Sequence, residues 1–86
     1  MPRVPGISEM LIKVNTHDHG PAHVHAFTGS GEVIILIPQR GEARLREAQP
    51  GVTKSDVSKA LGIVNENIGA CRRTWRQYHG EASDRR

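Results

Sequence analysis

Aromatic residues are nearly missing from this chain. Its 86 residues include one phenylalanine, one tryptophan and one tyrosine, which are Phe27, Trp75 and Tyr78. Proteins that hold single-stranded nucleic acid commonly stack successive bases on several aromatic side chains. Three rings argue against such a stacking platform, and we expect an aliphatic core.

Cysteine and long hydrophobic runs are equally scarce. Cys71 is the single cysteine, so no disulfide can form within the chain, which is typical of proteins from a reducing compartment. The longest apolar run covers residues 33–37, far short of the ~20 residues that a membrane-spanning helix requires. No signal peptide is evident. We therefore expect a cytoplasmic protein without a membrane segment.

Charge of one sign is in modest excess. The formal net charge is +3, and the last third of the chain is rich in arginine. Three arginines, Arg72, Arg73 and Arg76, fall close together in a segment with helical periodicity. Such a face either keeps the protein soluble or attracts an acidic partner, including the phosphates of a nucleic acid.

The length predicts a single domain over residues 1–86. Residues 1–8 contain two prolines and a glycine and predict an irregular lead-in. Residues 9–46 predict a sheet, because short stretches with period-two alternation are separated by turns. A helix is predicted over residues 53–79, and a flexible tail over residues 81–86.

Two of the predicted strands have a distinct character. Residues 33–37 are uniformly apolar, which predicts a central strand with both faces buried. Residues 42–46 alternate between apolar and charged, with Ala43 and Leu45 expected to point inward. Charged side chains of this kind are common on edge strands, where they discourage pairing with another sheet.

The clearest periodic signal lies in the predicted helix. Thr53, followed by Asp56 three residues later, resembles a capping box at its start. The apolar stripe consists of Val57, Leu61, Val64, Ile68, Cys71, Trp75 and Tyr78. A helix over this range measures roughly 37 Å at ~1.5 Å per residue, whereas strands of five or six residues span only ~17–20 Å.

Two explanations of this excess length stay open. The helix bends or breaks near Gly62 or Gly69, or its overhanging apolar end around Trp75 and Tyr78 is covered by another chain. We favour a partner or a homodimer, because the stripe keeps its phase past both glycines. The predicted fold class is α+β: a small, mostly antiparallel sheet of about four strands packed against one long C-terminal helix.

Four of the five histidines lie within nine residues, which makes this turn the candidate site. The candidate metal ligands are His17, Asp18, His19, His23 and His25. Three interpretations compete. The cluster binds a divalent metal such as zinc or nickel, the only cofactor that the sequence suggests. Alternatively, two histidines act as acid and base in cleaving RNA, with the arginines holding phosphate. In the third interpretation the turn is structural.

The turn also carries a resemblance to a known family. Residues 18–25 read D-H-G-P-A-H-V-H, which resembles the D-H-x-P-P-H-x-H hallmark of the domain-of-unknown-function family forty-one sixty. Residues 10–14 and 31–37 are similar to strands of that family, and residues 75–80, W-R-Q-Y-H-G, to the end of its closing helix. Ala22 replaces the second proline, and Val24 replaces the usual aromatic residue.

The resemblance implies a small bacterial protein, in a family often encoded beside a small partner and suspected of toxin–antitoxin-like roles. It supplies no established catalytic residues, so an enzymatic role is not the favoured interpretation. We expect a binding module that acts through a protein partner, either a toxin–antitoxin-like or a related defence or counter-defence component. The alternative is an RNase-like or nucleic-acid-binding protein that uses the histidine turn and the arginines.

Overall fold

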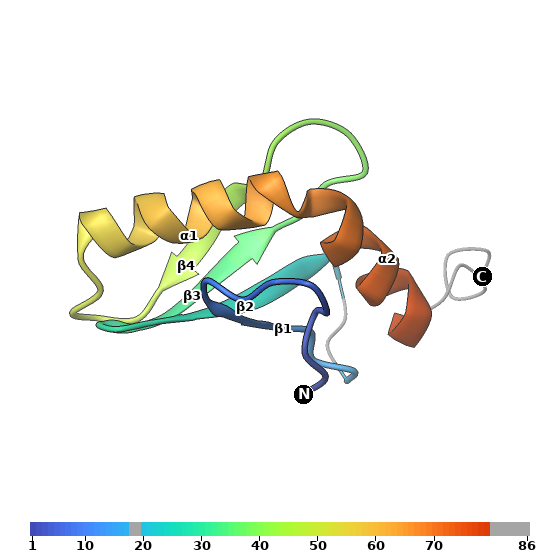
Figure 1. The fold of residues 1–86 in the computed structure, drawn as a ribbon, viewed down its shortest axis with the longest axis horizontal. Coiled ribbons are helices and arrows are strands. Elements are labelled where there is room, and N and C mark those ends of the chain that lie inside the picture. The colour runs from blue at the N-terminus through green and yellow to red at the C-terminus, as the bar shows by residue number, and fades with distance from the viewer. Residues whose placement is uncertain (18–19, 80–86) are drawn as a thin grey trace.

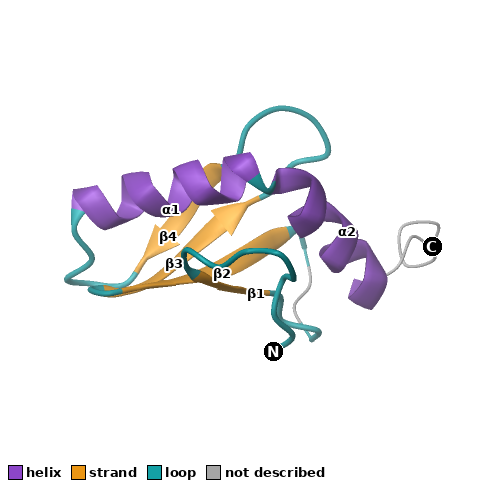
Figure 2. Cartoon of the chain, viewed as in Figure 1, coloured by secondary structure: helices purple, strands orange, loops and turns teal. Residues whose placement is uncertain are grey.

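The computed structural model describes residues 1–17 and 20–79. Its elements, in chain order, are β1 (Leu11–Lys13), β2 (His23–Thr28), β3 (Gly31–Leu36), β4 (Arg44–Ala48), α1 (Lys54–Glu66) and α2 (Ile68–His79). The four strands form one antiparallel sheet in the order β1-β2-β3-β4 (Figure 2). The predicted α+β class and its four-stranded antiparallel sheet are confirmed. Neither helix is long and apolar enough to cross a membrane.

The sheet is covered by α1 on one face only (Figure 1). The covered face presents side chains with no exposed surface: Ile12, Val24, Ala26, Val33 and Ile35. The neighbouring side chains Ile34 and Leu36 point to the other face and are only half-buried. The expectation that both faces of residues 33–37 are buried is therefore wrong for the second face, because a single helical layer can cover just one side of a sheet.

The positions of the last two strands follow the prediction more closely. β3 lies inside the sheet, between β2 and β4, and β4 lies at an edge. β4 starts two residues later than expected, and a register irregularity between Ile34 and Ile35 accompanies its pairing. Ala43 is buried as predicted, but Leu45 is 45% exposed. Leu45 pairs with Ile35 and therefore lies on the covered face as predicted, but it stays exposed because an edge strand has no further neighbour to cover it.

The N-terminal segment contributes more than an irregular lead-in would. Arg3 forms an antiparallel bridge with Lys13, and the backbone N–H of Val4 donates to the carbonyl of Ile12 at 2.9 Å. Val4 and Ile7 are both buried in the core. This segment covers the outer edge of β1, which leaves β4 as the edge whose outer side pairs with no described strand.

The long helix predicted over residues 53–79 is wrong, because the chain forms two helices that meet at Asn67. The backbone of Asn67 departs from helical values, with φ −119° and ψ 23°. Its side-chain amide donates to the carbonyl of Ile63 at 2.8 Å, so the side chain takes a backbone acceptor, as asparagine often does. The break falls at neither Gly62 nor Gly69. It lets α2 turn past the end of the sheet (Figure 1).

The start of α1 is attached to the β2–β3 turn. Thr53 is the N-cap, and its hydroxyl accepts a hydrogen bond from the backbone N–H of Asp56. The Ser30 hydroxyl donates to the Asp56 carboxylate at 2.6 Å and accepts from the backbone N–H of Thr53 at 3.1 Å. The hydrogen bond from Ser30 is the main reason why the pKa of Asp56 lies below its ordinary value. Thr53 is therefore the N-cap as predicted, but the N–H that Asp56 would accept in a capping box is accepted by Ser30 instead.

Gly31 is predicted to be the least replaceable residue of this turn. Its φ is +143°, and a Cβ there would lie 2.9 Å from Cγ2 of Val52. Gly31→Ala should therefore destabilise the fold by about 1–3 kcal/mol, measured by urea unfolding. Gly29→Ala in the same turn is the control, because a Cβ at Gly29 meets no atom within 4 Å. Equal stability of the two variants would contradict this assignment.

Candidate functional site

The second pair of the histidine turn is held on strand β2. His23 and His25 are two residues apart, so their side chains project from the same face of the strand. That face is the one opposite α1. Both residues are nevertheless buried, with 3% and 8% of their surfaces exposed. A buried imidazole requires hydrogen-bond partners for its ring nitrogens. A carboxylate of the neighbouring strand meets the ring of His25, and a backbone carbonyl of the preceding turn meets the ring of His23.

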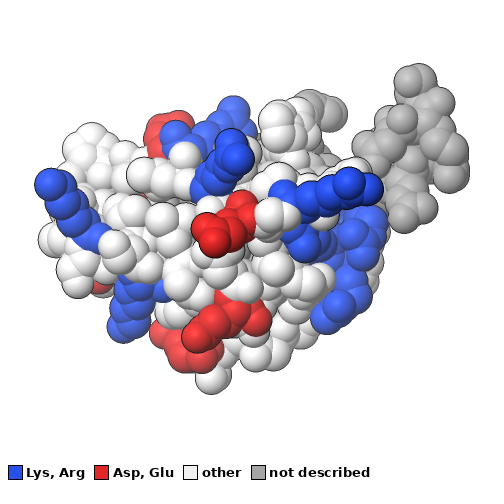
Figure 3. Space-filling model, turned by 90° about the horizontal axis from the view of Figure 1, so that it is seen from above, with Lys and Arg blue, Asp and Glu red and all other residues white. Residues whose placement is uncertain are grey.

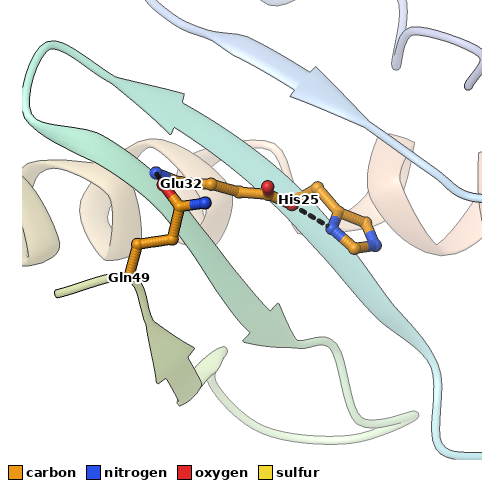
Figure 4. A network of polar contacts seen from close by, with 3 residues as sticks. All are labelled: His25, Glu32 and Gln49. Atoms are coloured by element: carbon orange, nitrogen blue, oxygen red, sulfur yellow. Dashed lines mark hydrogen bonds and ion pairs between the residues drawn. The ribbon is translucent and has the colours of Figure 1, made fainter.

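His25 is paired with a carboxylate from the neighbouring strand. Its Nδ1 lies 2.5 Å from Oε2 of Glu32, and Gln49 in turn accepts the backbone N–H of Glu32 at 2.8 Å (Figure 4). An ionised carboxylate can only accept, so Nδ1 of His25 is the donor. In the neutral ring the lone pair then resides on Nε2. A carboxylate that fixes an imidazole tautomer in this way is a common feature of general-base and metal sites.

His23 is fixed by the backbone of the turn that precedes it. Its Nδ1 donates to the carbonyl oxygen of Pro21 at 2.9 Å, which selects the same tautomer as in His25. The two imidazole rings lie edge to face, with 5.3 Å between their centroids and an angle of 62° between their planes. The two histidines of β2 are therefore presented as a pair of oriented rings.

α2 completes this arrangement from the far end of the sequence. The Trp75 ring lies 5.2 Å from the His23 ring. Trp75 also stacks against His79, with 3.6 Å between centroids and planes only 11° apart. Nδ1 of His79 donates to the carbonyl of Trp75 at 3.1 Å. We call His23, His25, Trp75 and His79 the histidine–tryptophan cluster.

Sequence reasoning missed two members of this environment. Glu32 was judged too distant in the sequence to share a site with the histidine pair, although a short hairpin over residues 28–31 pairs Phe27 with Glu32 and places Glu32 diagonal to His25 on one face. His79 was not connected to the turn because it lies more than fifty residues away in the chain. The one sequence feature that could have indicated its contact with Trp75 is that His79 follows Trp75 by four residues, which puts both rings on one face of a helix.

The metal prediction stays a prediction. His17 is exposed, and its backbone N–H donates to the side chain of Asn15 at 2.9 Å. Over residues 1–17 and 20–79, no three side chains of histidine, cysteine, aspartate or glutamate are arranged to hold a metal ion. Asp18 and His19, two of the five proposed ligands, lie outside the described residues. His23 and His25 are the two proposed ligands that the structure brings together.

The three arginines of α2 have different surroundings. Arg72 donates from Nε to the carbonyl of Pro38 at 2.8 Å and from a terminal nitrogen to the carbonyl of Gly41 at 2.9 Å. It thereby ties the β3–β4 loop to α2. Arg73 and Arg76 are exposed. Figure 3 shows basic side chains gathered at the end of the molecule that contains α2. Arg73 and Arg76 are thus the better placed of the three to meet an acidic partner.

The apolar stripe of α2 divides into a covered and an uncovered part. Cys71 has no exposed surface, and burial raises the pKa of its thiol to about 11. That combination describes an inert core residue, as expected for a thiol held in its protonated form. Trp75 is half-buried against the core, whereas Tyr78 is 44% exposed. The overhang expected at Trp75 and Tyr78 is therefore limited to Tyr78.

Trp75 and Tyr78 should consequently differ in their effect on stability. Trp75→Ala removes the ring that contacts both His23 and His79 and should lower the free energy of unfolding. Replacing a fully buried tryptophan by alanine costs about 3–5 kcal/mol, and the loss should be smaller here because Trp75 is half-buried. Tyr78→Ala should change stability by less than about 0.5 kcal/mol, as exposed positions usually do. Thermal and urea unfolding measure both. A larger loss for Tyr78→Ala than for Trp75→Ala would contradict this division.

Comparisons of the chain with protein-family models, curated proteins and solved structures gave no match. The resemblance to family forty-one sixty therefore stays a prediction carried by residues 18–25 and 75–80.

Proposed function

We propose that the chain is a small bacterial binding module that acts through a protein partner, as a toxin–antitoxin-like or related defence component. The observation that carries this proposal is the exposure of Tyr78. Tyr78 continues the helical face of Cys71 and Trp75, yet 44% of its surface is exposed. A tyrosine left exposed at the end of an otherwise covered stripe supports contact with a second molecule, because tyrosine is enriched among the residues that dominate protein interfaces.

The composition of the α2 end favours a protein as that second molecule. Tyr78 is accompanied on the same helix by the exposed arginines Arg73 and Arg76. Tyrosine and arginine are enriched among the residues that dominate binding energy in protein interfaces. Because both charges are positive, the matching surface should offer carboxylates around an apolar pocket. We define the α2 surface as Arg73, Arg76 and Tyr78. With 3.6 residues per turn, both arginines lie more than a third of a turn around the helix from Tyr78, so the proposed contact is centred on Tyr78 and the arginines lie at its margin.

The product of the adjacent gene is the natural probe, since the resemblance implies a small partner encoded next to this protein. Isothermal titration should detect a complex, and Tyr78→Ala should weaken it by about 2 kcal/mol or more, the loss typical of a central contact. Arg73→Ala should act mainly on the association rate and should lose its effect at high salt.

Lys59→Ala on α1 is the control, because Lys59 is exposed and lies outside the α2 surface. It should leave the affinity unchanged. The proposal fails for this partner if the two proteins do not associate, or if Tyr78→Ala binds as tightly as the control variant.

A second function is favoured by the pair of His25 and Glu32. His25 is oriented by a carboxylate and lies beside a second histidine. Pairs of this kind can act as the general acid and the general base, which supports an RNase-like activity. The low exposure of His23 and His25 weighs against it, because a substrate phosphate has to reach the ring nitrogens. The same low exposure agrees with a structural role for the cluster, and for this reason catalysis ranks second.

Cleavage of a single-stranded RNA of defined sequence tests this second function. His25→Ala should abolish cleavage, and Glu32→Gln should lower the rate, because the carboxylate that accepts the hydrogen bond from Nδ1 of His25 and orients its ring is lost. His17→Ala is a matched control, since His17 is an exposed histidine of the same turn. The RNase-like activity is excluded if the wild-type protein does not cleave the RNA, or if His25→Ala and His17→Ala cleave it at equal rates.

A further inference from the structure

The sheet face opposite α1 is partly apolar and carries charges of both signs. We call this surface the open face. Its half-buried and exposed side chains are Leu11, Lys13, Phe27, Glu32, Ile34, Leu36 and Glu47. The buried rings of His23 and His25 lie on the same side of the sheet, where Trp75 of α2 packs on His23. The stick view of Figure 4 looks onto it, with the helices behind the strands. Antiparallel sheets commonly keep one polar face in water, but the apolar share here is high.

The two halves of the open face differ in shape and charge. On the half formed by β3 and β4, a hollow of about 120 Å³ is lined by Glu32, Ile34, Glu47 and Gln49. On the half formed by β1 and β2, the ammonium group of Lys13 lies 5.7 Å from the centre of the Phe27 ring. One half therefore offers an acidic recess, and the other a basic side chain laid over an aromatic ring.

The register of the strands places these features at matching levels. Lys13 pairs with His25, His25 with Ile34, and Ile34 with Glu47, so Lys13 and Glu47 stand at opposite ends of one row across the sheet. In the adjacent row Leu11 pairs with Phe27 and Phe27 with Glu32. With strands about 4.8 Å apart, the row from β1 to β4 is roughly 14 Å wide.

A two-fold axis parallel to the strands, between β2 and β3, makes this face complementary to itself. The rotation places β1 of one copy opposite β4 of the other, and β2 opposite β3. Residues at the same height along the strands stay at the same height and therefore face each other. Lys13 then faces Glu47 of the second copy, and Phe27 faces Glu32 of the second copy. Because the axis is two-fold, the same contact between the Lys13–Phe27 pair and the acidic hollow forms a second time with the copies exchanged. Sheets packed face to face lie about 10 Å apart, a gap that lysine and glutamate side chains can bridge.

We propose that the open face is a homodimer interface, in which Lys13 and Phe27 of each copy occupy the hollow lined by Glu32 and Glu47 of the other. The occupant is a second copy of this chain because the complementarity is internal: each half of the face matches the other half under a two-fold rotation. A two-fold contact of this kind is the commonest arrangement among soluble oligomers.

Sedimentation equilibrium of the full chain over a range of concentrations tests the dimer. The wild type should reach twice its monomer mass, with an affinity that falls as salt rises. Lys13→Glu sets like charges against each other twice per dimer and should raise the dissociation constant by more than about tenfold. Glu47→Lys should do the same, and the double variant Lys13→Glu, Glu47→Lys should recover the dimer.

Lys59→Glu is the matched control, because it makes the same charge reversal on α1, away from the open face. It should sediment like the wild type. Circular dichroism shows whether each variant is folded, and Glu47→Lys at the exposed edge strand remains informative if Lys13→Glu does not fold. A wild type that stays monomeric at millimolar concentration overturns the proposal. So does a double variant that is no better associated than either single one.

Discussion

The bend at Asn67 is the constraint on which the rest of this structure depends. A straight helix over the whole apolar stripe would extend well beyond a sheet of short strands. Breaking the helix at Asn67 keeps α1 on the sheet and turns α2 past the end where β2 begins. The bend thereby places the Trp75 ring against His23 and puts Cys71 into the core. Without it, no element would connect the C-terminal part of the chain to the histidine turn.

Two histidines of β2 occupy buried positions, where apolar side chains are more common. His23 and His25 are nearly inaccessible, and both use Nδ1 as a hydrogen-bond donor, one to a carbonyl and the other to a carboxylate. With Trp75 in contact with both His23 and His79, the rings link strand β2 to α2. In a chain with so few aromatic residues, imidazole rings supply planar surface that phenylalanine or tyrosine would otherwise provide.

The small size of the domain explains why so much surface remains for binding. Within the described residues, α1 covers one face of the sheet, and α2 covers only the end of the other face, where Trp75 packs on His23. The open face and the α2 surface are both consequences of that incomplete cover. A short domain buries a smaller share of its surface than a long one, so association with a second copy or with another protein would add stability as well as function.

Local sequence patterns determined the elements of this protein. Period-two alternation located the strands, the uniformly apolar run located the inner strand β3, and Thr53 located the start of α1, because each signal arises from neighbouring residues. Contacts between distant residues were decided by the tertiary structure. The break at Asn67 is accompanied by a hydrogen bond from its side chain to the carbonyl of Ile63, and the pairing of Glu32 with His25 depends on strand register. The meeting of Trp75 with His23 depends on both, since their separation in the chain leaves no local pattern to detect.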